Sequence, residues 1–156
     1  MPPSEEIRLA EIDEGNWAQA LNLAVREEQR PFLADAAGIL ARGYAYRRSR
    51  ARVRAVCAGE TLVGLMLVRD LDEEPACYDL NQFMIDRRYQ NRGYGSRALA
   101  LLLEELAAER KYPAVELCVR RDAAQALRVY GRAGFRDTGW TDPENPNCLN
   151  LRYTFD

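Results

Sequence analysis

The sequence predicts a mixed α/β sheet within one domain. The chain has 156 residues, enough to bury the core of one domain without disulfides or a metal. Runs of β-type residues alternate with segments of helical periodicity, an order that is typical of a mixed sheet. The sequence contains no internal repeat and no linker rich in Pro, Gly or Ser. We therefore expect residues 1–156 to form a single domain.

The first half of the chain gives two predicted helices followed by strands. Asn16 is a suitable cap for the first helix, and Pro31 is expected to end it. A short link containing Gly59 separates two β-rich runs, which indicates a hairpin. The predicted elements are a strand at residues 7–12, helices at 17–25 and 33–46, strands at 52–58 and 62–68, an acidic loop at 70–75 and a strand at 77–85.

The second half contains the clearest helix of the chain. Its apolar stripe consists of Leu99, Leu102, Leu103 and Leu106. Pro113 follows as a stop, and Gly134 stands where a later helix would end in the left-handed conformation. The predicted elements are a helix at 96–110, a strand at 114–119, a helix at 123–133 and strands at 135–141 and 149–155.

The charge and hydropathy of the chain argue against several classes of partner. The formal net charge is -2, which argues against general binding of nucleic acid. The longest apolar run is too short for a membrane span, and the N-terminal residues lack the apolar core of a signal peptide. We therefore expect no nucleic-acid partner, no membrane insertion and a cytoplasmic location.

The residue types also limit the chemistry. The chain contains no histidine, which excludes Ser-His-Asp and Cys-His catalysis and His-ligated metals. Its cysteines form no C-x-x-C pair, so we expect neither a zinc site nor a disulfide framework. Cys57 and Cys118 lie in apolar, strand-like runs and are predicted to be buried. A catalytic base must then be a carboxylate, a tyrosine, water or a backbone group.

A glycine turn connects the strand at 77–85 to the clearest helix. Unpaired N–H groups at a helix N-terminus bind anions, and the helix dipole adds to the attraction. Gly93 and Gly95 lack Cβ atoms, so the backbone can approach a pyrophosphate closely. The turn is therefore a candidate phosphate site, with a plain glycine turn before a helix as the alternative. Nearby positive charge comes from Arg87, Arg88 and Arg92.

The same turn also fits the G-x-G-x-x-A pattern of dinucleotide-binding proteins, through Gly93, Gly95 and Ala98. Glu116 follows at roughly the spacing expected of the ribose-binding acid. However, residues 86–92 separate the turn from its strand, and Glu116 falls in the middle of a predicted strand. Only about 60 residues follow, too few for the further βαβ units of a doubly wound sheet. The dinucleotide alternative is therefore disfavoured.

Two motifs in this region resemble those of the GNAT family of N-acetyltransferases. The turn Gln90-Asn91-Arg92-Gly93-Tyr94-Gly95 matches the pattern Q/R-x-x-G-x-G/A. The later segment has the pattern A-x-x-x-Y-x-x-x-G-F, formed by Ala126, Tyr130, Gly134 and Phe135. The resemblance is strongest over residues 77–136 and implies a mostly antiparallel central sheet flanked by about four helices.

The resemblance implies an acetyl-CoA-dependent, metal-free N-acetyltransferase in which the amine attacks directly in a ternary complex. Tyr130 matches the tyrosine that protonates the departing thiolate, although its helical spacing also suits a core tyrosine. A backbone N–H within residues 83–85 would stabilise the carbonyl oxygen. The residues implied in cofactor binding are Phe83, Met84, Ile85, Gln90, Asn91, Arg92, Gly93, Tyr94, Gly95, Ser96 and Tyr130.

The acceptor side resembles bacterial polyamine (spermine/spermidine) acetyltransferases, which implies acceptor contacts from Gln29, Phe32 and Asn81. Asn81 departs from that group, whose members tend to have Asp there, and Ala123 stands where the wider family often has Asn. Candidates for the general base are Asp79 and Glu116, acting directly or through water, with solvated strand residues as the alternative.

The expected function is acetyl transfer to the primary amine of a small, cationic molecule such as a polyamine or diamine. The acidic residues at 70–74 would attract such an amine. Acetylation of a protein N-terminus or lysine is one alternative, and a coenzyme A-binding domain without catalysis is another. The oligomeric state stays open, with a homodimer among the alternatives.

Overall fold

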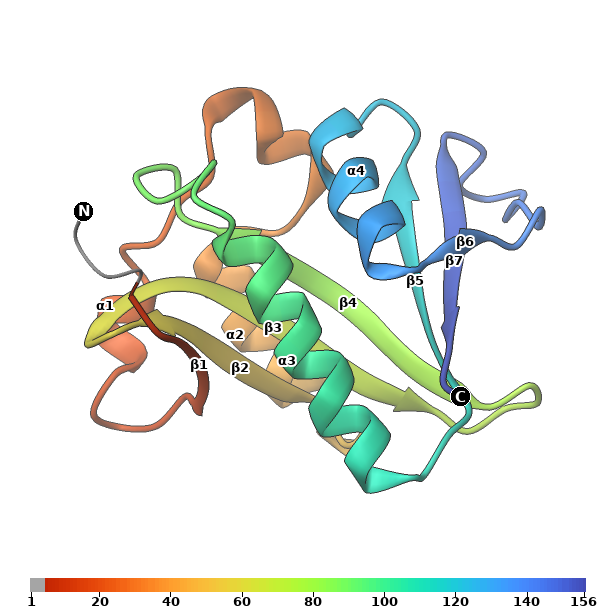
Figure 1. Cartoon of the computed structure of the whole chain (residues 1–156), viewed down its shortest axis with the longest axis horizontal. Helices are drawn as coiled ribbons and strands as arrows, with labels where there is room; N and C mark the ends of the chain where they lie inside the picture. Colours follow the sequence, from red (N-terminus) through yellow and green to blue (C-terminus); the bar gives the residue numbers. More distant parts are fainter. Residues whose placement is uncertain (1–4) are drawn as a thin grey trace.

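A computed structural model describes residues 5–156 of the chain (Figure 1). In this part of the chain the strands form one seven-stranded sheet with the order β1-β2-β3-β4-β5-β7-β6. Neighbouring strands are antiparallel except β4 and β5, which are parallel, so the predicted mixed and mostly antiparallel sheet is confirmed. The strands are β1 (Ile7–Glu11), β2 (Arg52–Ala58), β3 (Thr61–Leu71), β4 (Cys77–Ile85), β5 (Ala114–Arg120), β6 (Arg136–Asp137) and β7 (Cys148–Thr154). The helices are α1 (Trp17–Ala20), α2 (Ala36–Ala45), α3 (Tyr94–Glu109) and α4 (Ala124–Ala133), with 3-10 turns η1 (Glu27–Phe32) and η2 (Arg47–Ser49).

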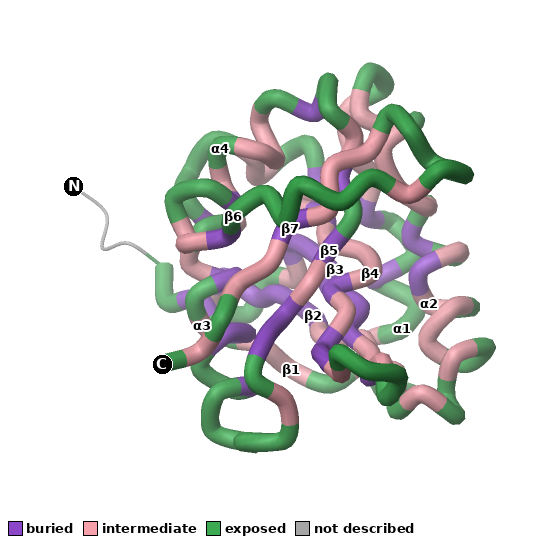
Figure 2. The backbone as a smooth tube through the Cα atoms, turned by 90° about the vertical axis from the view of Figure 1, so that its right-hand side faces the viewer, coloured by how far each residue is buried: buried purple, intermediate pink, exposed green. Residues whose placement is uncertain are grey.

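Strand β3 is buried on both faces, which explains its nearly continuous apolar sequence. Met66 and Val68 belong to the core beneath α3, whereas Leu65 and Leu67 pack with residues of α1 and α2. Helices α3 and α2 accordingly cover opposite faces of the sheet (Figure 1). Figure 2 shows the buried residues gathered along the central strands and the exposed ones along the outer loops.

The first helix is much shorter than the sequence predicts. It ends at Ala20 instead of continuing to Val25, and the side chain of Asn16 does not cap it. That side chain instead accepts from the Asp13 amide and donates to the Glu11 carbonyl. Ala24 is held by residues after β4, since its amide donates to Asp86 at 2.9 Å. This hydrogen bond between distant parts of the chain holds the residues around Ala24 outside the helix.

Other element boundaries also differ from the prediction. Pro31 lies inside η1 rather than after a helix, and α2 begins at Ala36, behind the Asp35 cap. Helix α3 begins two residues before the predicted start at position 96, because Gly93 takes the left-handed conformation and serves as its cap. The strand expected at 135–141 is confined to Arg136–Asp137.

A bulge in β4 determines where the sheet opens. The β3–β4 register pairs Leu67 with Gln82 and Val68 with Leu80, so Asn81 is an extra residue without a partner in β3. Bulges bend a strand and increase its local twist. Strands β4 and β5 pair only at the start, through Tyr78 and Asp79. Beyond the bulge they diverge, and the later half of β4 has a free edge.

The acidic segment at 70–74 does not lie where the sequence predicts. Asp70 belongs to β3 and is only 3% exposed, and its carboxylate contacts Arg50 and Lys111 at 2.8 Å and Arg52 at 3.3 Å. Burial alone would raise the pKa of this carboxyl, but the hydrogen bonds from Arg50 and Lys111 lower it to about 2. Asp70 therefore stabilises the fold through an ion-pair cluster instead of attracting an amine.

Replacing Asp70 by Asn is expected to lower the free energy of unfolding by about 3 kcal/mol at neutral pH, the value of a pKa depressed from about 3.9 to about 2. Because the folded pKa is depressed, this stabilisation is present above the unfolded pKa of about 3.9 and is lost as pH falls towards 2. Denaturant unfolding at pH 7 and near pH 2.5 measures the difference. Glu73→Gln, on the exposed hairpin, is the control. An equal deficit of Asp70→Asn at both pH values would contradict this account.

Candidate functional site

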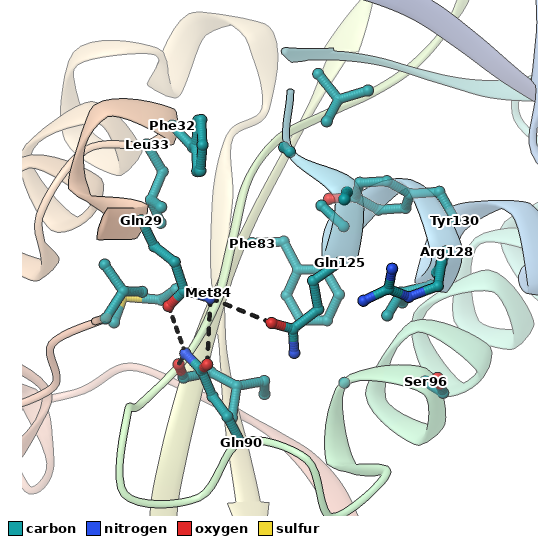
Figure 3. Close-up of a pocket in the computed structure, with 18 of the residues that line it drawn as sticks. Gln29, Phe32, Leu33, Phe83, Met84, Gln90, Ser96, Gln125, Arg128 and Tyr130 are labelled. Atoms are coloured by element: carbon teal, nitrogen blue, oxygen red, sulfur yellow. Dashed lines mark hydrogen bonds between the residues drawn. The ribbon is translucent and has the colours of Figure 1, made fainter. Parts of the chain in front are cut away.

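A cleft of about 480 Å³ opens where β4 and β5 diverge (Figure 3). The free half of β4 forms one wall, and α4 with the end of β5 forms the other. Segment η1 borders the cleft on the side opposite α4, and the turn before α3 closes its lower end in the figure. The cleft brings together nearly all of the residues that the sequence implies for the cofactor. Phe83, Met84, Ile85, Gln90, Asn91, Gly93, Tyr94, Gly95, Ser96 and Tyr130 all line it, whereas Arg92 does not.

The free edge of β4 presents backbone groups to the cleft. The Asp86 amide donates to the Val63 carbonyl on the β3 side at 2.7 Å. Backbone groups alternate between the two edges of a strand, so Phe83 and Ile85 face the opening towards β5. The Ile85 carbonyl accepts from the Gln90 side chain at 2.9 Å, as expected for a group on the open edge. The backbone of Phe83 is thus the part of β4 that is open to a ligand.

The turn between β4 and α3 has the geometry of an anion site. Asn91 and Gly93 adopt left-handed backbone conformations, with φ of 63° and 79°. Gly93 directly precedes the sixteen-residue helix α3, whose first N–H groups lack intrahelical acceptors. A Cβ added to Gly95 would lie 3.6 Å from Ile85 and 3.7 Å from Phe83. The glycine therefore leaves the floor of the cleft uncovered beside the helix N-terminus.

Asp86 stabilises the turn between β4 and α3 through hydrogen bonds. It is 1% exposed and accepts from the Arg88 amide at 2.9 Å and the Arg88 side chain at 2.8 Å. Burial opposes ionisation, but the hydrogen bond from Arg88 outweighs it and lowers the pKa of the Asp86 carboxyl. The positive charge of Arg88, predicted to be available to a phosphate, is therefore paired with Asp86. The sequence motifs did not predict the pairing of Asp86 with Arg88, although an acidic residue at the end of a buried strand is a recognisable signal.

Tyr130 lies on α4, at the wall of the cleft opposite β4 (Figure 3). The residue is 9% exposed, and its ring packs against Phe83 and Phe135, with centroids 6.4 Å and 5.6 Å away. Within residues 5–156 its hydroxyl makes no hydrogen bond, and burial raises the pKa of Tyr130. The group is therefore protonated at neutral pH and retains an unused proton at the cleft.

The structure does not bring Asp79 or Glu116 into the cleft. Asp79 pairs with Arg69 at 2.8 Å, and Glu116 pairs with Arg152 at 3.1 Å. Glu116 also accepts from the thiol of Cys77. Both carboxylates lie at the part of the sheet where β4 and β5 are still paired, ahead of the opening. Their contacts are those of structural ion pairs.

The residues expected at the acceptor, Gln29, Phe32 and Asn81, all line the cleft. Asn81 is held by its neighbours, since its amide donates to Asp79 at 3.2 Å and its oxygen accepts from Arg42 at 3.5 Å. None of the residues 70–79 lines the cleft. Among the described residues that do, Glu28 alone carries a carboxylate, so the cleft is less acidic than the sequence predicts.

Several cleft residues lie outside the predicted set. Gln125, Arg128 and Arg132 project from α4, and the helical spacing of these polar residues is the signal that reveals them. Cys118 is exposed rather than buried, whereas Cys57 is buried as predicted. The reason is that Cys118 lies on the part of β5 that has lost its β4 neighbour and faces the cleft.

Comparison with known proteins identifies the family. The model of the Acetyltransferase (GNAT) family matches residues 16–135 of the chain. The chain belongs to the GNAT family. The family resemblance inferred from the turn and the later tyrosine motif is thereby confirmed, and the chain is an N-acetyltransferase that uses acetyl-CoA.

The GNAT chain is similar to a spermine/spermidine N(1)-acetyltransferase of Bacillus subtilis, with 27% identity over 87% of this chain and 91% of the relative. Its fold is similar to that of the aminoglycoside acetyltransferase AAC(6')-Ib in complex with coenzyme A, with a TM-score of 0.77 and 15% identity over 96% and 95% of the two chains. It is also similar to a spermidine N-acetyltransferase from Vibrio cholerae in complex with coenzyme A and spermine, with a TM-score of 0.72 and 13% identity over 95% of each chain.

The residues of the cleft fit coenzyme A. The helix N-terminus with its left-handed turn suits a pyrophosphate, and the free edge of β4 offers hydrogen-bonding groups to an amide-containing arm. Within residues 5–156 no cluster of histidine, cysteine or acidic residues is arranged to hold a metal ion. In the same part of the chain no helix has the length and hydropathy needed to cross a bilayer.

Proposed function

We propose that this GNAT enzyme transfers the acetyl group to the primary amine of a small cationic molecule of the polyamine or diamine type. The observation that carries the proposal is the hydroxyl of Tyr130, which lies across the cleft from the free edge of β4 and has no hydrogen-bond partner in the part of the chain that the structure describes. A proton donor and a free backbone edge, facing one another across a cleft, are what acyl transfer from a thioester requires.

The turn before α3 would hold the pyrophosphate through backbone N–H groups at Gly93, Gly95 and Ser96. When bound, acetyl-CoA supplies the acetyl group as a thioester. The Phe83 amide, on the free edge of β4, would then donate to the thioester oxygen as negative charge develops there. Tyr130 would give its proton to the sulfur as the C–S bond breaks and the bond between the carbonyl carbon and the amine nitrogen forms.

The acceptor amine must first lose a proton, because an aliphatic ammonium has a pKa near ~10.4. Asp79 and Glu116 are held in ion pairs outside the cleft. Asp79 nevertheless accepts from the cleft residue Asn81 at 3.2 Å, so a water beside Asn81 would connect this carboxylate to an acceptor. In the proposal the ammonium proton leaves through water rather than directly to either carboxylate.

Glu28 supports a cationic acceptor. It lies on η1, and no hydrogen bond or ion pair engages its carboxylate within residues 5–156. Its neighbour Glu27 is 88% exposed, lies 3.9 Å from Arg30 and does not line the cleft. The relatives named for spermine and spermidine act on amines of the class that such a carboxylate attracts.

Acetylation of a panel containing spermine, a diamine, kanamycin and a peptide with a free N-terminus tests the proposed function. We expect the small cationic amines to give a higher kcat/KM than the peptide, with an advantage that decreases as salt rises. Glu28→Gln should raise the KM for these amines about 2- to 5-fold, the value of an exposed ion pair, whereas Glu27→Gln should leave it unchanged.

Acetylation of the peptide in preference to every small amine would favour the alternative of a protein acetyltransferase. Coenzyme A binding without turnover of any acceptor would favour a binding domain. Equal effects of Glu28→Gln and Glu27→Gln would remove Glu28 from the proposed acceptor site.

A further inference from the structure

Amide side chains from three parts of the chain meet across the cleft (Figure 3). Gln29 comes from η1, Gln90 from the turn after β4 and Gln125 from α4. Gln125 in turn donates to Asn91, next to Gln90, at 3.3 Å. We call this group of Gln29, Gln90, Gln125 and Asn91 the amide clasp.

The centre of the amide clasp is a reciprocal pair. Gln90 donates to the Gln29 oxygen at 2.8 Å, and Gln29 donates back to the Gln90 oxygen at 3.2 Å. The remaining bonds of the pair reach the backbone, because Gln90 donates to the Ile85 carbonyl at 2.9 Å and Gln29 accepts from the Arg26 amide at 3.0 Å. The link to α4 is longer, at 3.4 Å between Gln29 and Gln125. The pair thus joins the turn firmly to η1 and only weakly to α4.

The segment around η1 carries the acceptor side of the cleft and has few other attachments. Ala24 is bonded to Asp86 and Arg87 before it, and the Ala34 amide donates to Gln82 at 2.9 Å after it. Between these two anchors, none of the residues in η1 is buried. Phe32 is the residue of η1 that packs against the core, partly buried and 5.0 Å from the guanidinium of Arg120. The Gln29–Gln90 pair is the hydrogen-bonded connection between η1 and the cofactor turn.

We propose that Gln29 is a positioning residue that couples the acceptor side of the cleft to occupation of the cofactor turn. Gln90 and Asn91 belong to the turn that would hold the pyrophosphate, so a ligand that orders this turn also fixes the acceptor of Gln29. Because Gln29 is bonded to Gln90, ordering of the turn also restricts the motion of η1, which carries Glu28 and Phe32. The inference rests on the cofactor site of the proposed function but not on the identity of the acceptor.

Amide hydrogen exchange with and without coenzyme A tests this coupling without any acceptor. In the wild-type protein, coenzyme A should slow exchange in residues 90–96 and also in η1, the latter by about 5-fold or more if the coupling has the usual size. Gln29→Met keeps the length of the side chain but removes its hydrogen bonds. This variant should keep the protection of 90–96 and lose the protection of η1.

Two further variants refine the test. Gln19→Met places the same change on exposed α1, where Gln19 makes no side-chain hydrogen bond within residues 5–156, and should behave like the wild type. Gln29→Glu retains an oxygen that accepts from Gln90 and from the Arg26 amide, and should restore most of the η1 protection. In turnover, Gln29→Met should raise the KM of the amine with little change in kcat.

The possible outcomes distinguish a failure of the coupling hypothesis from a failure of the proposed cofactor site. Protection of 90–96 with none of η1 in the wild type would overturn the coupling alone. Equal η1 protection in the wild type and in Gln29→Met would also overturn it. Absence of protection anywhere would overturn the cofactor site at the turn, and the coupling with it. A panel of amines that all fail as substrates would affect only the proposed acceptor.

Discussion

Replacing Tyr130 by Phe is expected to lower kcat by about 10²–10⁴-fold, the usual contribution of a general acid, with little change in affinity for acetyl-CoA. The substitution removes the hydroxyl, which makes no hydrogen bond within residues 5–156, and keeps the ring that packs against Phe83 and Phe135. The melting temperature should therefore change little. Because burial raises the pKa of Tyr130, wild-type kcat should not decline from loss of this proton until pH exceeds the ordinary tyrosine range.

Tyr130→Ala provides the comparison that separates the acid from a packing role. It removes the ring as well and should lower stability by about 3–5 kcal/mol through a cavity, as for other large aromatic truncations. Single-turnover kinetics and thermal unfolding of both variants give the two readouts. Full kcat in Tyr130→Phe, together with a large loss of stability in Tyr130→Ala, would assign Tyr130 to the core and leave protonation of the thiolate to solvent.

Gly95→Val is expected to abolish the thermal stabilisation of the protein by acetyl-CoA. At a hundredfold excess over Kd, a bound ligand stabilises by about 2.7 kcal/mol, which is readily seen as a shift in melting temperature. The Cβ position itself is 3.6 Å from Ile85 and 3.7 Å from Phe83, which is an ordinary contact distance. The added methyl groups of valine would extend beyond it, at the floor of the cleft beside the helix N-terminus.

Gly95→Ala is the matched control for this prediction. A single methyl fits the observed contacts, so it should keep the fold and most of the cofactor response. NADH should give no shift with the wild type, because the strand and turn geometry is not that of a dinucleotide-binding unit. A shift with NADH and none with acetyl-CoA, or an undiminished response of Gly95→Val, would contradict the assignment of the turn.

The sequence predicts the parts of the fold that depend on strong local signals. The leucine stripe of α3 and the β-rich runs of β2 to β4 follow from periodicity alone, and these elements contribute residues to the core. The segment from Trp17 to Ala34 is different, because Ala24 and Ala34 form hydrogen bonds with residues far along the chain. Such contacts have no local signature, so a helix was predicted where the structure has a short helix and a 3-10 turn.

The candidate site likewise has one part that the sequence predicts and one part that it does not. The turn at residues 90–95 and Tyr130 are recognisable because each is fixed by motif spacing on one element. The acceptor side depends on which carboxylates the fold brings to the cleft, and this cannot be read from composition. Asp70, Asp79 and Glu116 are engaged by arginines or lysine brought from other elements, and Glu28 is left beside the cleft.

The bulge at Asn81 gives this protein an edge strand in the middle of its sheet. A free strand edge ordinarily invites pairing with another chain and is a site of aggregation. Here η1 and α4 stand on the two sides of the free edge, along the cleft of about 480 Å³. The unpaired backbone groups of β4 therefore lie between two flanking segments, and covering a strand edge in this way is one of the means by which folded proteins protect it.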